Sequence, residues 1–283
     1  MMTDLDVLLP IDSYPTPTPD RAFEDAVRLA VGLGGKLTGL AIEVAIPVHS
    51  NQLADYLIGL TAMAAEEERR SRDACHESLG RFAAAARAAN VFQAMSSVRI
   101  NHFGIGDYAA RLARTHDLCM IPITVGPPGN LDLAQAVVFG SGHPVLTFRT
   151  GQVGDLSLGP DLVVVAWDGG QRAARAMSDA LPILTRARRV RILSVINERP
   201  DTLIDPGTAA QAYLARRGVA SVLDSVDAEA GAIGKVFDQY VEQHTPDLLV
   251  MGAYGHSRAR EFLLGGATEH VLKTPPCPVL LSH

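Results

Sequence analysis

The sequence predicts an α/β protein made of two successive doubly wound domains, and three observations lead to this prediction. Short, nearly continuous apolar runs, typical of strands buried on both faces, alternate with helical patterns along the chain. Four of these runs recur in the same order in both halves. The chain has 283 residues, more than one average domain holds. Alternation of strand and helix predicts parallel sheets with helices on both faces.

The strands are predicted as four pairs of similar segments. Each first strand is an apolar run that ends in an aspartate, "DVLLPID" in the first half and "LVVVAWD" in the second. The predicted strands of the first half are residues 6–12, 36–42, 117–123 and 143–148, and their counterparts are residues 162–168, 189–196, 247–253 and 277–282.

Helices are predicted between these strands. Apolar residues recur on a helical period in residues 20–33, and Gly34 and Gly35 form a stop. Residues 171–187 are the counterpart, and residues 106–117 and 232–247 each lead into a strand. The extra length of the first half, residues 50–90, predicts one long helix or two joined helices. Its "EEERR" patch is interpreted as a solvated face with close acid–base pairs, with a partner-binding helix as the alternative.

Two domains are therefore expected at residues 1–150 and 159–283. The segment between them, Thr150 to Asp161, is rich in glycine and lacks periodicity, as a linker does. Each domain would have a usual size.

Composition excludes several classes of protein. The net charge of −6 argues against general nucleic-acid binding, and the densest basic run, residues 186–191, is interpreted as a solvated strand entrance. The three cysteines form no CxxC pair, which fits a reducing compartment. No apolar segment approaches the length of a membrane span, and the acidic start does not resemble a signal peptide. We therefore expect a cytoplasmic protein without membrane contact.

Candidate binding residues follow the strands of the second half. Ligands of open α/β sheets bind at the carboxyl ends of the strands, near the switch in strand order. Asp168 follows the first strand there, and its carboxylate could bind a ribose hydroxyl or cap the next helix. Glycines follow the fourth strand, where they allow backbone N–H groups to approach a phosphate. A helix that begins near Gly266 would direct its N-terminal N–H groups to the same place, with the Thr268 hydroxyl in its first turn.

The glycine spacing carries a family resemblance. Gly252-x2-Gly255-x9-Gly265 lies between a strand and a helix, and Gly266, Ala267 and Thr268 follow it. This pattern resembles the nucleotide-binding branch of the universal stress protein family, and the two halves together look like a tandem member of it. The resemblance implies a five-stranded parallel sheet of order 3-2-1-4-5 in each half. It also implies ATP, possibly with Mg²⁺, as the ligand of the second half.

The resemblance assigns roles to individual residues. It places Asp168 near adenine and ribose, Val195 in the wall of the adenine pocket, and Gly252 and Gly255 around ribose and phosphates. It places the phosphates against the turn formed by Gly265, Gly266, Ala267 and Thr268. The chain departs from the family at Gly266, where a serine or threonine is usual. One hydroxyl is lost and the backbone donor remains, so weaker binding is expected, by about 1 kcal/mol.

The first half departs further from the pattern. Gly126 and Gly129 have GxxG spacing, but the two prolines between them remove N–H donors, and the nine-residue spacer is missing. Asp12 is present and is followed by a proline-rich segment. We expect that this half does not bind ATP in the usual way and instead serves as a pairing or regulatory half. The apolar fifth strands of the two halves are expected to pair, and a homodimer remains open.

Three functions remain open at this point. The first is an ATP-binding regulatory module of the stress response, with unknown protein clients and slow hydrolysis at most. The second is a nucleotide-free interaction protein, which Gly266 favours. The third is an enzyme of adenylyl-transfer or pyrophosphatase type, although no catalytic motif was found. His270, next to the glycine segment, is interpreted as a polar surface residue.

Overall fold

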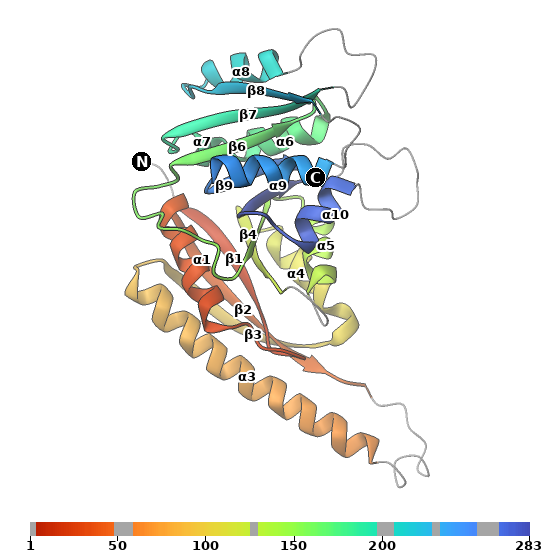
Figure 1. Ribbon diagram of the computed structural model, residues 1–283. Coiled ribbons are helices and arrows are strands. Elements are labelled where there is room, and N and C mark those ends of the chain that lie inside the picture. The colour runs from red at the N-terminus through yellow and green to blue at the C-terminus, as the bar shows by residue number, and fades with distance from the viewer. Residues whose placement is uncertain (1–3, 48–58, 125–129, 197–206, 228–232, 254–265) are drawn as a thin grey trace.

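A computed structural model describes residues 4–47, 59–124, 130–196, 207–227, 233–253 and 266–283. Its ten strands form one sheet in the order β3-β2-β1-β4-β5-β10-β9-β6-β7-β8. In Figure 1 the sheet runs from β3 at the bottom to β8 at the top. The five strands of each half therefore have the order 3-2-1-4-5, as the family resemblance implies. Within each half all neighbouring strands are parallel.

The first half contributes five strands, which are β1 (Leu5–Asp12), β2 (Gly35–Ala45), β3 (Phe92–Asn101), β4 (Leu118–Ile123) and β5 (Val145–Arg149). The second half contributes β6 (Leu162–Trp167), β7 (Arg189–Ile196), β8 (Val222–Asp227), β9 (Leu248–Gly252) and β10 (Val279–Ser282).

The helices of the first half are α1 (Asp20–Leu33), α3 (Leu60–Ala88), α4 (Ile105–Ala113) and α5 (Leu131–Gly140), with a short 3-10 turn at His102–Gly104. Those of the second half are α6 (Gln171–Asp179), α7 (Leu181–Leu184), α8 (Gly207–Ala215), α9 (Ile233–His244) and α10 (Gly266–Lys273). Among the described residues, no helix combines the length and the apolar character that a membrane span requires.

The two halves share one sheet because their fifth strands pair. β5 and β10 run antiparallel, with Leu146 opposite Leu280. This pairing confirms the expectation for the two apolar fifth strands, which would otherwise be exposed edges. It also refines the predicted architecture, because two five-stranded sheets are continuous with one another.

Helices from both halves cover each face of the sheet. One core cluster joins the sheet to α1, α3, α6, α7 and α8, and the other joins it to α4, α5, α9 and α10. Both clusters contain residues of both halves, so the hydrophobic core is continuous across the β5–β10 junction. Burial of these apolar side chains is the main favourable term in folding.

The linker is fixed against α1. Asp25, buried in α1, accepts a hydrogen bond from the Gly151 N–H at 2.5 Å, and Arg28 donates to the Val153 carbonyl at 2.8 Å. Leu156 is buried directly over Gly32, where any side chain would collide with it. The segment that looks irregular in sequence is therefore packed against the first half.

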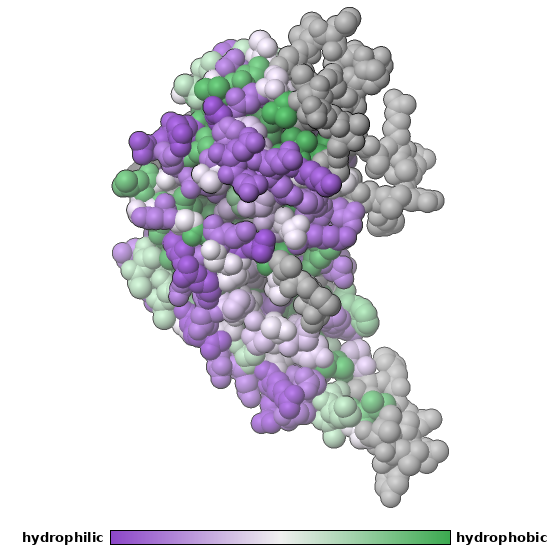
Figure 2. Space-filling model, in the orientation of Figure 1, coloured by the Kyte–Doolittle hydropathy of each residue, from purple (hydrophilic) through white to green (hydrophobic). Residues whose placement is uncertain are grey.

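Three helical details refine the sequence prediction. The extra segment of the first half forms one helix over its described part, α3, and its Arg69 and Arg70 pair with Glu66 and Glu67. The predicted solvated face is confirmed, and Figure 2 shows a hydrophilic surface along α3. The single helix expected over 171–187 is wrong, because the structure divides it into α6 and α7 where Pro182 starts a new turn.

Candidate functional site

The candidate site lies where the strand order of the second half changes direction. β6 pairs with β9 on one side, with Val165 opposite Val250, and with β7 on the other, with Trp167 opposite Ser194. Continued by a residue or two, these registers bring Asp168, Val195 and Gly252 to the same edge of the sheet. This is the position at which open α/β sheets bind ligands.

The turn after β6 is shaped by Asp168. Its Oδ1 atom accepts a hydrogen bond from the Gly170 N–H at 2.7 Å, and Gly169 between them has a left-handed φ of 75°. The residue that caps α6 is Gly170, without a side-chain hydrogen bond. The alternative that Asp168 is the N-cap of this helix is therefore wrong. Its carboxylate instead holds a tight turn at the end of β6.

Gly252, the last residue of β9, lies against the start of α6. A Cβ atom at this position would lie 2.6 Å from both the Ala173 nitrogen and the Arg172 carbonyl carbon. These are backbone atoms, which cannot move aside cheaply. Gly252 therefore permits a close approach of α6 to β9, which is a structural role independent of any ligand.

The phosphate turn expected from the resemblance is described from Gly266 onward. Gly266 is the first residue of α10, it is exposed, and a Cβ atom there would meet nothing within 4 Å among the described residues. Ala267 packs partly against the core, and Thr268 is only 2% exposed. Gly255, Gly265 and the side chain of Val195 lie outside the described residues, so their expected roles stay predictions.

Residues that the sequence analysis did not select lie next to this edge. Arg172 of α6 has its Nη2 atom 3.1 Å from Nε2 of His283, which follows β10. The ring of Phe139, from α5 of the first half, contacts the His283 ring edge-on at 5.1 Å. Burial and the neighbouring Arg172 lower the pKa of His283 below its usual value. The first half thus contributes the Phe139 ring beside the candidate site of the second half. No local sequence pattern predicts this contact.

His270 joins α10 to α9. Its Nε2 atom lies 2.9 Å from both carboxylate oxygens of Asp238, and its side chain is 31% exposed. The interpretation of His270 as a polar surface residue is therefore incomplete, because the side chain is partly buried and oriented by a partner. A histidine–aspartate pair 32 residues apart in sequence has no local signal.

The equivalent edge of the first half is occupied by its own side chains. Asn130, just before α5, donates from Nδ2 to the Pro122 carbonyl at 2.7 Å and to Asp12 Oδ2 at 3.2 Å. Its Oδ1 accepts the Thr124 N–H at 3.0 Å. Burial raises the pKa of Asp12 to about 6, and the Asn130 hydrogen bond partly offsets this shift. One amide side chain therefore ties the ends of β1 and β4 together.

Beside the contact of Asn130 with Asp12, two serine side chains form hydrogen bonds at the ends of β1 and β2. Ser13 Oγ donates to the Ile42 carbonyl at 2.5 Å and lies 2.6 Å from Ser71 Oγ of α3. Ser71 in turn accepts the Val44 N–H at 2.9 Å. Both serines are buried, so the ends of β1 and β2 are linked to α3. Gly126 and Gly129, singled out in the sequence, lie outside the described residues.

Comparison with known proteins bears on the second half. Residues 161–283 match the model of the Universal stress protein family. This match covers the strands, the glycine segment and α10 of the second half. A universal stress protein of Synechocystis, Slr1230, is 28% identical over 121 residues, which are 42% of this chain and 41% of that protein. The match thus spans less than half of the length of that curated universal stress protein.

Solved structures resemble the whole chain. A universal stress protein from Archaeoglobus fulgidus covers 98% of this chain and 97% of its own, with a TM-score of 0.69 and 16% identity. A functionally unknown protein from Pseudomonas aeruginosa covers 98% and 92%, with a TM-score of 0.54 and 15% identity. These likenesses establish the fold, with both halves included.

Proposed function

We propose that this chain is a tandem universal stress protein that binds one ATP in its second half and acts as a regulatory module. One observation carries the proposal. Asp168 and Gly252 lie at the strand-order switch of a half that matches the family, and α10 follows the glycine segment of the same half. The topology makes this edge the expected ligand position.

Backbone groups would supply most of the phosphate contacts. The first N–H groups of α10 have no partner within the helix, and the helix dipole favours an anion at this end. The space beside Gly266 is open, so a phosphate could approach the backbone closely. Such a site does not need the lysine of other phosphate-binding loops.

Asp168 would recognise the nucleoside. Its carboxylate is held by the Gly170 N–H, and a fixed carboxylate is a good acceptor for ribose hydroxyls. We propose little or no ATP hydrolysis, because the sequence contains no recognised catalytic motif beside the glycine segment. Binding of ATP would change which protein partner is bound.

Asp168→Ala tests this function against a matched control. Asp155 in the linker accepts the Ser157 N–H at 2.9 Å in a similar turn, before β6 and outside the strand-order switch. Calorimetry with ATP and Mg²⁺ should show binding to the wild type and to Asp155→Ala. Asp168→Ala should bind at least roughly ten-fold more weakly, as expected for loss of a charged hydrogen bond. Absence of ATP binding to the wild type would overturn the proposal.

A further inference from the structure

The position of α10 decides where its N-terminal N–H groups lie. This helix spans only Gly266–Lys273, and two of its side chains, Val271 and Leu272, are fully buried in the core. Both anchors lie in the second half of the helix. In its first turn Thr268 is 2% exposed and Ala267 packs partly against the core, and a polar contact with a neighbouring helix would add to their hold on its direction.

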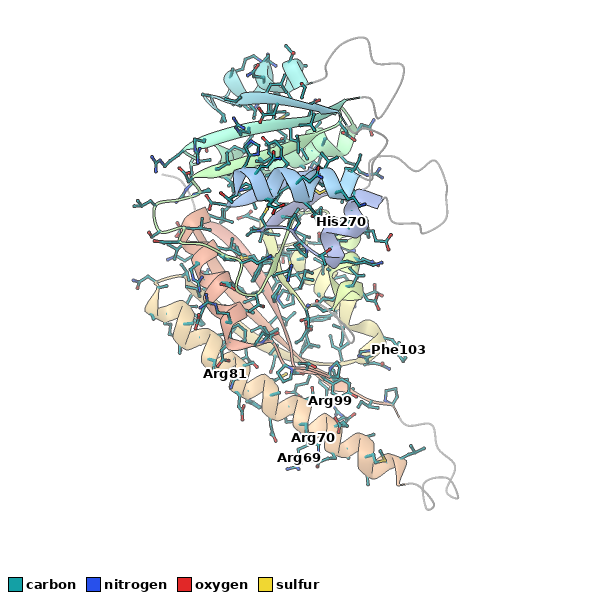
Figure 3. The ribbon with its side chains drawn as sticks, in the orientation of Figure 1. Arg69, Arg70, Arg81, Arg99, Phe103 and His270 are labelled. Atoms are coloured by element: carbon teal, nitrogen blue, oxygen red, sulfur yellow. The ribbon has the colours of Figure 1, made fainter. Side chains whose placement is uncertain are left out.

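His270 supplies a contact between α10 and α9 at this point. Its Nε2 atom bonds both oxygens of Asp238 at 2.9 Å, and Figure 3 shows His270 on α10, beside α9. The imidazole lies over Gly234, where a Cβ atom would be 2.5 Å from the ring. The neighbouring helix therefore provides both a carboxylate for the ring nitrogen and a gap for the ring.

The contact is connected directly to the first turn. In an α-helix the N–H of one residue bonds the carbonyl four residues earlier, so residue 270 lies one turn from Gly266. A rotation of His270 about the helix axis would carry the first-turn N–H groups with it. Asp238 on α9 opposes that rotation.

We infer that His270 and Asp238 are positioning residues that hold the first turn of α10 where it can bind the nucleotide phosphates. This inference rests on the proposed function. The imidazole acts through the helix and does not itself touch the ligand. The pair thus links α9 to the phosphate end of the site.

Two substitutions at one position separate the hydrogen bond from the bulk of the ring. His270→Leu fills the space over Gly234 and removes the donor, whereas His270→Gln retains an N–H donor of similar reach. Lys273→Gln is the control, because it breaks the Glu269–Lys273 pair at 2.5 Å, which lies within α10. All three variants change one polar contact of the same helix.

Hydrogen exchange and calorimetry on the full chain give the two measurements. In the absence of ligand, the amides of residues 270–273, which bond the carbonyls of residues 266–269, should exchange faster in His270→Leu than in the wild type, and at the wild-type rate in the other two variants. The Kd for MgATP should rise roughly three- to five-fold in His270→Leu alone, the range for a partly exposed charged contact.

Each outcome decides a separate point. Unchanged exchange in His270→Leu, or no rescue by His270→Gln, overturns the positioning role whether or not ATP binds. If the wild type binds ATP and His270→Leu binds it with the same Kd, the link between the His270–Asp238 pair and the phosphates is overturned. A wild type that binds no ATP overturns the proposed function itself, while the exchange data still report on α10.

Discussion

The ends of the strands in the two halves have the same topology and opposite chemistry. In the first half, Asn130 and Asp12 satisfy one another and the backbone across β1 and β4. In the second half, Gly252 ends β9 at the corresponding edge, and α10 begins at Gly266 later in the same half. Polar groups that already bond each other have little to gain from a ligand, whereas open N–H groups at a helix start bind anions. Two edges of the same topology thus differ in the groups that they present, and the proposed ATP site lies at the edge of the second half.

The difference arises from the length of the segment after the fourth strand. β4 ends at Ile123 and α5 begins at Leu131, whereas β9 ends at Gly252 and α10 begins only at Gly266. The shorter connection brings Asn130 back over the ends of β4 and β1.

The largest effect is expected for Gly252→Val. The new side chain would collide with backbone atoms of Arg172 and Ala173. We expect a loss of at least about 3 kcal/mol in the free energy of unfolding, together with loss of ATP binding. Urea denaturation measures the first effect and calorimetry the second. Gly266→Ala, with open space around it, is the control and should retain near wild-type stability; equal destabilisation by both variants would contradict the close approach.

Asn130→Ala should lower the stability of the protein and leave its ATP affinity unchanged. The change leaves the Thr124 N–H and the Pro122 carbonyl without their partner, at a cost of roughly 1–3 kcal/mol in the free energy of unfolding. ATP affinity should stay at the wild-type value, because the contact lies in the first half. A gain of a second ATP site in this variant would show that Asn130 alone closes the first half. Denaturation and calorimetry provide both readings.

Asp12→Asn should stabilise the protein near neutral pH. Because the pKa in the folded state is raised to about 6 from 3.8, the folded protein prefers the protonated carboxyl. The contribution of the protonated Asp12 carboxyl to the free energy of unfolding is fully present below pH 3.8 and is lost as the pH rises through about 6. An uncharged amide avoids this loss, so we expect a gain of about 1–2 kcal/mol at pH 7. The difference in unfolding free energy between wild type and variant should shrink as the pH falls toward 4; a constant difference would refute the cause.

The smallest effect is expected for Gly266→Ser, which returns the hydroxyl usual in the family that this segment resembles. Nothing lies within 4 Å of the new Cβ atom, so the side chain fits without rearrangement. One added neutral hydrogen bond should tighten the Kd for ATP by about five-fold, equivalent to about 1 kcal/mol. Gly266→Ala should show no such gain in calorimetry. Equal affinities of the serine and alanine variants would mean that position 266 does not contact the phosphates.

Much of the fold is predictable from sequence because eight strands are buried apolar runs that repeat. The sequence analysis did not locate β3 and β8, the two edges of the sheet. β3 is mostly exposed, and β8 carries Asp224 and Asp227, so neither has the apolar pattern of a central strand. The break at Pro182 was missed because the apolar pattern continues across it.

The site was predictable only in part. Spacing placed Asp168, Gly252 and Gly266 after the correct strands, because each is local to its strand or helix. Contacts such as Asn130 with Asp12 and His270 with Asp238 join distant segments, and a single sequence contains no local pattern for them.

The stoichiometry of ATP binding to the full chain tests the contrast between the halves most directly. Calorimetry with ATP and Mg²⁺ should give one site per chain, weakened by Asp168→Ala and unaffected by Asp12→Ala. Two sites per chain, no site, or a single site that depends on Asp12 and not on Asp168 would contradict the account.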